Sequence, residues 1–154
     1  MAPICNPITL PMAAERLIPH RAPMRLVDTL VSVNDGCAVA ESVLPRSAIM
    51  ADEEGKIDEV AFMELIAQSY AAFKGYMDRL DGKPPGEGFL VGVRDLAVAG
   101  RAYAGDRLLT SIRTVAAVGG FAVVEGAVTR GDETLASGTL KLWLVDPAAG
   151  GNDR

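Results

Sequence analysis

Residues 58–82, DEVAFMELIAQSYAAFKGYMDRLDG, decide the fold of this chain. The segment has no glycine or proline before Gly75, and from Val60 to Phe73 apolar residues occupy nearly the whole circumference of a helical projection. A helix that is apolar on all sides is buried on most of them. We therefore predict one long helix that the rest of the chain must cover.

Both ends of this helix carry signals. Asp58 is placed to act as an N-cap or as a first-turn acid, because a carboxylate is favourable at the positive end of the helix dipole. Gly82, followed by Pro84-Pro85, ends the helix because neither residue type continues it well.

The segment before the helix has the period of a β-strand. From Met24 to Val33 the residues alternate, Asn34-Asp35-Gly36 supplies a tight turn, and Cys37 to Leu44 returns as a second strand. Asp28 falls on the side of this strand that carries apolar residues, so we expect its carboxylate to satisfy a neighbouring backbone group.

The chain ends are expected to lie outside the main fold. We expect residues 1–16 to form an arm, with a short helical piece around Met12 to Leu17, and residues 17–146 to form the single domain. The tail, residues 147–154, is rich in glycine and polar residues, and we expect it to be disordered.

After the helix the chain consists of strands joined by short turns, so the sheet is antiparallel. Four strands are predicted: Phe89–Val98, Arg107–Val118, Phe121–Thr129 and Thr134–Val145. One sheet curled around one apolar helix is the α+β arrangement called the hotdog fold. Because one sheet leaves part of the apolar surface uncovered, we expect the chain to form a dimer.

Composition excludes several classes of function. The formal net charge of −5 has the wrong sign for general nucleic-acid binding. Two cysteines and one histidine are too few for the usual zinc sites or a disulfide scaffold, and we expect no metal or other cofactor. No run of eighteen apolar residues and no secretory signal is visible, so we expect no membrane span and a cytoplasmic location.

Glu64 is the unusual residue of the helix, because it stands among apolar residues. An ionised and unpaired carboxylate there would cost several kcal/mol. Gln68 lies one turn further along the same face, so the two polar groups can share a pocket. Glu64 is thus a candidate for catalysis or, alternatively, for a structural pair with an arginine or a backbone amide. His20 lies in a loop before the first strand and is the one histidine of the chain. Histidine is the side chain whose ordinary pKa lies near neutral pH, so His20 is the candidate for proton transfer.

Three segments resemble bacterial 3-hydroxyacyl-ACP dehydratases of fatty-acid synthesis, which have the hotdog fold. Residues 17–28, LIPHRAPMRLVD, are similar to the opening of that family, and residues 63–68, MELIAQ, resemble its central-helix motif. Residues 104–106, AGD, resemble its proline-glycine-aspartate step before a strand. The similarity extends from about Leu17 to Val145.

The resemblance implies a substrate, a partner and roles for residues. The substrate would be an acyl thioester of acyl carrier protein or CoA, and Glu64 would protonate the departing hydroxyl. Gln68 would line the substrate pocket, and backbone amides near the helix start, here at Asp58 and Val60, would hold the enolate oxygen. The family's catalytic histidine is absent, because Met50 stands at its position.

That departure makes the chain more similar to the divergent dehydratase-like proteins of aryl-polyene and related lipid gene clusters. Three alternatives stay open: a dehydratase in which His20 is the base or an orienting donor, an acyl thioesterase that uses Glu64, or a catalytically impaired subunit. The last would pair with a second hotdog protein, whereas the first two fit a homodimer or a larger homo-oligomer.

Overall fold

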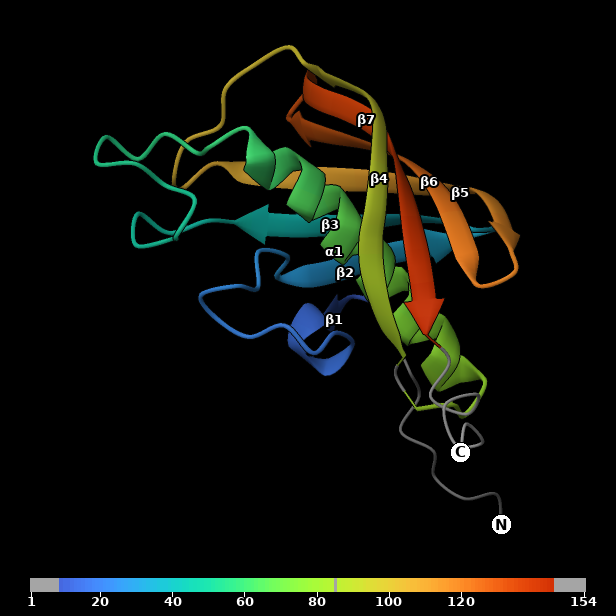
Figure 1. The fold of residues 1–154 in the computed structure, drawn as a ribbon. Coiled ribbons are helices and arrows are strands. Elements are labelled where there is room, and N and C mark those ends of the chain that lie inside the picture. Colours follow the sequence, from blue (N-terminus) through green and yellow to red (C-terminus); the bar gives the residue numbers. More distant parts are fainter. Residues whose placement is uncertain (1–8, 85, 146–154) are drawn as a thin grey trace, which may run out of the picture.

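In the computed structural model one antiparallel sheet curls around one helix, α1 (Val60–Leu80), as Figure 1 shows. The structure describes residues 9–84 and 86–145. The sheet has seven strands in the order β1-β2-β3-β5-β6-β7-β4. Their bounds are Met12–Ala13 (β1), Thr29–Asn34 (β2), Cys37–Val43 (β3), Glu87–Val98 (β4), Arg107–Val118 (β5), Phe121–Arg130 (β6) and Glu133–Val145 (β7). This architecture confirms the predicted fold.

The core lies between α1 and the concave face of the sheet. Phe62, Leu65 and Ile66 on the helix are at most 1% exposed, and they pack against Leu108, Val124 and Leu140 of the strands. Helix and sheet come close together at Gly126 of β6, where a Cβ atom would stand 2.5 Å from Ile66 Cγ2. Only a glycine lets the sheet come this near to the helix.

The hairpin turns are those that the sequence indicates. Asp35 and Gly36 join β2 to β3 with positive φ angles of 47° and 75°, and Gly119 and Gly120 join β5 to β6 with φ angles of 60° and 83°. Two successive residues in the left-handed region match the twist of a two-residue hairpin. These turns set the register of the paired strands.

The predicted strand from Met24 is wrong in its first five residues, because β2 begins only at Thr29. The backbone amides of Leu26 and Val27 donate to the side chain of Gln68 on α1 instead of to a neighbouring strand. Asp28 behaves as expected: its Oδ2 accepts from the Val43 amide at 2.8 Å, which closes the end of β3.

The short helical piece predicted at Met12 to Leu17 is partly correct. Met12–Ala13 form a two-residue strand that pairs with β2, and only Ala14–Arg16 form a turn of 3-10 helix. Residues 1–8 of the expected arm and the expected disordered tail, 147–154, lie outside the described residues. The expected division of the chain at residues 16 and 146 stays a prediction.

Candidate functional site

A cavity of about 680 Å³ runs along one side of α1. The helix forms its floor, the first residues of β4 and the last of β7 form one wall, and the loop that carries Pro19 and His20 forms the other. His20, Glu64 and Gln68 all line it. The structure therefore brings together three of the five residues that the sequence indicates for the site.

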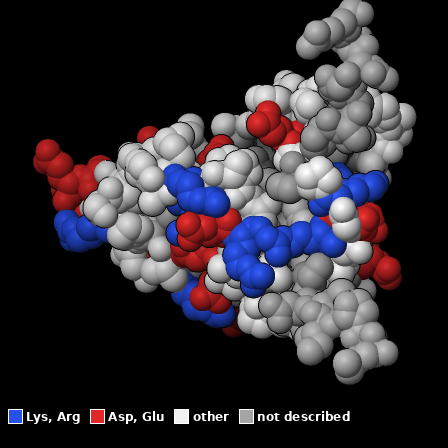
Figure 2. Space-filling model, turned by 90° about the horizontal axis from the view of Figure 1, so that it is seen from below, with Lys and Arg blue, Asp and Glu red and all other residues white. Residues whose placement is uncertain are grey.

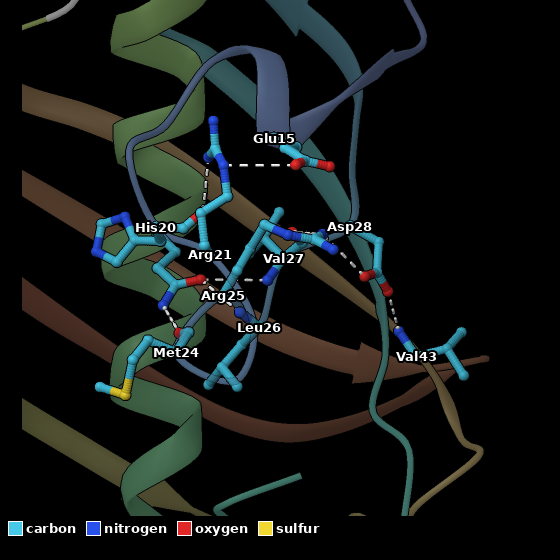
Figure 3. A network of polar contacts seen from close by, with 10 residues as sticks. Glu15, His20, Arg21, Met24, Arg25, Leu26, Val27, Asp28 and Val43 are labelled. Atoms are coloured by element: carbon cyan, nitrogen blue, oxygen red, sulfur yellow. Dashed lines mark hydrogen bonds and ion pairs between the residues drawn. The ribbon is translucent and has the colours of Figure 1, made fainter. Parts of the chain in front are cut away.

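The side chain of Gln68 makes four hydrogen bonds in this site. Its side chain is 1% exposed, and its Oε1 accepts hydrogen bonds from the backbone amides of Leu26 (2.7 Å) and Val27 (3.2 Å). Its Nε2 donates to the carbonyl of Met24 (2.8 Å) and to Glu64 Oε1 (2.8 Å). Gln68 thus ties the segment after His20 to the helix and to Glu64, and Figure 3 shows that segment folded against α1.

Glu64 is half-buried, and its hydrogen-bond partner among the described residues is Gln68. Neither an arginine nor a backbone amide in that part of the chain pairs with it. The expectation that Glu64 and Gln68 share a pocket is confirmed. Because Gln68 engages Oε1, Oε2 is available to a proton, a water molecule or a ligand in the cavity.

His20 lies across the cavity from the helix, in a loop held in place through its neighbour. Arg21 Nη1 donates to the carbonyls of Ile18 and His20, both at 2.8 Å, and Arg21 pairs with Glu15 at 3.4 Å (Figure 3). His20 Nδ1 is buried and has no hydrogen-bond partner among the described residues. Because the residue also lines the cavity, its imidazole can accept a proton from a bound ligand.

Asp58 and Val60 lie outside the cavity at the start of α1, where both are exposed. Asp58 Oδ1 accepts a hydrogen bond from the Val60 amide at 2.9 Å, so Asp58 caps the first turn as predicted and occupies that amide. The enolate-holding role of these residues stays a prediction. Met50 is joined to the same turn, because the Asp58 amide donates to its carbonyl at 2.8 Å.

The cavity has a second polar group that sequence reasoning missed. Tyr70, Lys74 and Asp78 follow Glu64 along the same side of α1 and line the cavity toward the end of the helix. Lys74 Nζ lies 2.5 Å from Asp78 Oδ1, and Asp78 is 5% exposed. Burial, and secondarily the charge of Asp78, raise the pKa of Tyr70 above 10.0. The spacing of four residues from Tyr70 to Lys74 and from Lys74 to Asp78 could have indicated this group, because residues four apart on a helix are neighbours.

The described residues contain no cluster of three or more histidine, cysteine, aspartate or glutamate side chains that could hold a metal ion. In the same part of the chain, no helix is long and apolar enough to cross a membrane. A hollow of about 670 Å³ on the outer face of the sheet contains none of the predicted site residues.

Charges of both signs are mixed on the surface. Figure 2 shows lysine and arginine side chains next to aspartate and glutamate side chains on the face seen from below. On the sheet, Arg107 pairs with Glu41 at 2.8 Å and Arg113 with Glu125 at 2.6 Å. These arginines are therefore largely neutralised by their neighbours.

Comparison with known proteins agrees with the fold. Residues 12–149 match the ApeP-like family, described as ApeP dehydratase. A curated relative, 3-hydroxyacyl-[acyl-carrier-protein] dehydratase FabZ of Symbiobacterium thermophilum, is 29% identical over 137 residues, which are 86% of this chain and 94% of that protein.

Solved structures show the same architecture. The dehydratase heterocomplex ApeI:P from Xenorhabdus doucetiae contains a chain with a TM-score of 0.82 and 19% identity, over 89% of this chain and 93% of that one. A hypothetical thioesterase from Streptococcus pneumoniae, solved with coenzyme A, has a TM-score of 0.58 and 13% identity, over 76% and 84%. At these identities the likeness establishes the fold alone, which is a hotdog.

Proposed function

Because the chain belongs to the ApeP-like dehydratase family, we propose that it dehydrates 3-hydroxyacyl thioesters of acyl carrier protein or CoA in fatty-acid or polyene biosynthesis. The observation that carries this proposal is that His20 and Glu64 line the same largely apolar cavity, one on each side. An apolar cavity with a few convergent polar groups is the usual form of a small-molecule site.

In the proposed reaction the imidazole of His20, which lines the cavity, accepts the proton from the carbon next to the thioester carbonyl. The electron pair of that C–H bond becomes the new C–C double bond, and the bond to the 3-hydroxyl breaks. Glu64, as the carboxylic acid, gives its proton to the departing hydroxyl, which leaves as water. Proton exchange with solvent then restores both side chains.

Gln68 is a positioning residue in this scheme. Its Nε2 fixes Glu64 Oε1, which leaves Oε2 to face the ligand, and its Oε1 fixes the backbone that follows the His20 loop. One buried side chain thus sets the separation of the proposed acid and base. Such preorganisation lowers the cost of reaching a reactive geometry.

Glu64→Gln is the direct test, because it keeps the shape of the side chain and removes the transferable proton. We expect it to abolish formation of the conjugated enoyl thioester, followed by its absorbance, while the size of the assembly in gel filtration is unchanged. Glu59→Gln is the matched control, since Glu59 is an exposed carboxylate outside the cavity. Near-normal turnover by the Glu64 variant contradicts the proposal.

A thioesterase is the second candidate, because Glu64 alone could activate water for attack on a thioester. The replacement of the family's loop histidine by Met50 favours it, since hydrolysis of this kind needs no second group. Saturated acyl thioesters separate the two reactions. Release of free thiol from a saturated substrate indicates hydrolysis, whereas a new conjugated double bond from a 3-hydroxy substrate indicates dehydration.

We also propose that a second hotdog subunit covers β4, an edge strand that pairs only with β7 among the described strands. Phe89, Val91 and Val93 on this strand are 53%, 52% and 43% exposed. A long edge strand with exposed apolar side chains is a ready site for pairing. The cavity wall includes Phe89, so this subunit would also cover one side of the cavity.

The covering subunit is a second copy in a homodimer, or a different hotdog protein if this chain is the catalytically impaired member of a pair. Turnover by the purified chain alone supports the homodimer. Absence of turnover alone, with activity restored by a co-purifying hotdog subunit, supports the heterodimer.

A further inference from the structure

The edge strand β4 differs from the other strands in the state of its charged side chains. On the other strands every charged side chain has a partner in the same chain: Arg107 with Glu41, Arg113 with Glu125, Arg130 with Asp106 and Glu133, and Lys141 Nζ over the Phe121 ring at 4.5 Å. Glu87, Arg94 and Asp95 of β4 are exposed and form no ion pair with any described residue. These three side chains are available to the charges of another subunit.

A β-bulge decides which side chains of β4 share a face. Leu90 and Gly92 lie opposite consecutive residues of β7, so Val91 is the extra residue of the bulge. Without it, positions 87 and 94 would lie on opposite faces of the strand, because side chains alternate. With the bulge, the face turned away from α1 carries four residues of the first part of β4: Glu87, Phe89, Gly92 and Arg94.

These four residues are placed symmetrically about a point between Leu90 and Val91. Glu87 lies as many residues before that point as Arg94 lies after it, and Phe89 and Gly92 are related in the same way. A second β4 strand that runs antiparallel about a twofold axis at this point would set Glu87 opposite Arg94 twice. It would also set each Phe89 ring against a glycine, which leaves room for the ring.

Other registers fit this strand less well. A slip by one residue sets side chains of the outer face opposite side chains of the inner face, and it brings Glu87 opposite a second acid, Asp95. A slip by two residues in either direction matches fewer outer-face residues and separates Glu87 from Arg94. A second bulge between Arg94 and Ala97 ends the regular stretch, so the symmetric part of β4 is also the part that can pair.

We propose that β4 pairs with β4 of a second copy of this chain, antiparallel and in the register that sets Glu87 opposite Arg94. The inference rests on the proposal that a hotdog subunit covers β4, and it identifies that subunit as a second copy. Glu87, Phe89 and Leu90 line the cavity. Arg94 of the second copy therefore lies beside the cavity wall, and each subunit contributes a guanidinium to the border of the other subunit's cavity.

Two charge reversals test this register without turnover. Glu87→Arg and Arg94→Glu each replace two attractive pairs of the dimer by two like-charged pairs, so the dissociation constant of each variant should rise by about tenfold. Analytical ultracentrifugation measures it, and circular dichroism checks that each subunit is folded.

A one-to-one mixture of the two variants is the decisive experiment. In a mixed dimer the new arginine of one variant meets the new glutamate of the other, and the native Arg94 meets the native Glu87. We therefore expect the mixture to dimerise with nearly wild-type affinity. Arg113→Glu and Glu125→Arg are the matched controls, because this outer-face pair lies within one chain, away from β4. Neither control, alone or mixed, should change the affinity of the dimer.

Unchanged dissociation of both β4 variants overturns the inference, and so does a mixture that dimerises no better than its components. A wild-type chain that stays a monomer on its own overturns the second copy, and it makes a different hotdog protein the subunit that covers β4. If the mixture restores the dimer but neither dehydration nor hydrolysis is observed, the proposed reaction fails while the pairing of β4 stands.

Discussion

Gln68 Nε2 donates a hydrogen bond to Glu64 Oε1 at 2.8 Å across one turn of α1, and Gln68 Oε1 accepts a hydrogen bond from the backbone amide of Leu26. The same side chain therefore holds the candidate acid and anchors the backbone that follows the candidate base. Stability and site geometry are coupled through one buried residue.

The first prediction follows from this coupling. Gln68→Leu leaves the buried amides of Leu26 and Val27 without an acceptor, so we expect the free energy of unfolding to fall by about 2–4 kcal/mol. Urea denaturation measures the loss. Ser69→Ala is the control, because the buried Ser69 hydroxyl has no partner among the described residues, and we expect its removal to be nearly neutral. Equal stability of the two variants would contradict the anchoring role.

Gly75 provides a second prediction. A Cβ atom at Gly75 would collide with the carbonyl oxygen of Leu17, which is a backbone atom that cannot rotate away. Gly75→Ala should gain about 1 kcal/mol in helix propensity but lose about 2–3 kcal/mol to overpacking, so thermal unfolding should occur at a lower temperature. At Gly92 a Cβ would meet Lys141 Cβ at 3.7 Å, so Gly92→Ala should cost less. A Gly75 variant as stable as wild type would show that the loop before His20 is not fixed by this contact.

The pH dependence of stability has a predicted sign. The pKa of Tyr70 is raised by burial and by Asp78, so the folded state keeps the phenol proton at pH values where the unfolded chain has lost it. The contribution is complete below the unfolded pKa of 10.0 and is lost as the pH rises through the higher folded value. Tyr70→Phe should make the unfolding free energy fall less steeply in this alkaline range than wild type or Tyr76→Phe. Parallel curves for all three proteins would count against a raised pKa.

The edge of the sheet gives a fourth prediction. Val91→Lys places a charge on β4, where Val91 is 52% exposed in the single chain, so folding of the subunit should be preserved. If β4 joins two subunits, light scattering should show a smaller species. Val118→Lys changes a residue that is 76% exposed at the end of β5, and it should leave the assembly intact. An unchanged assembly in both variants would place the interface elsewhere.

The sequence by itself determined the elements that depend on local interactions. The long helix and the four strands after it lie within two residues of their predicted bounds, because residue period and turn glycines act over a few residues. The pairing of Glu64 with Gln68 was predictable for the same reason, since residues four apart on a helix are neighbours.

Only the tertiary structure decided where β2 begins, which strand lies at the edge, and that His20 shares a cavity with Glu64. Each depends on contacts between segments that are distant in the sequence. Gln68 Oε1 accepts a hydrogen bond from the amide of Leu26, 42 positions away, and Gly75 packs closely against the backbone of Leu17. A local pattern reports which face of an element is apolar, but it does not report which distant backbone group will satisfy a buried side chain. The cavity that contains His20 and Glu64 therefore depends on the packing of the helix, the loop and the sheet against one another.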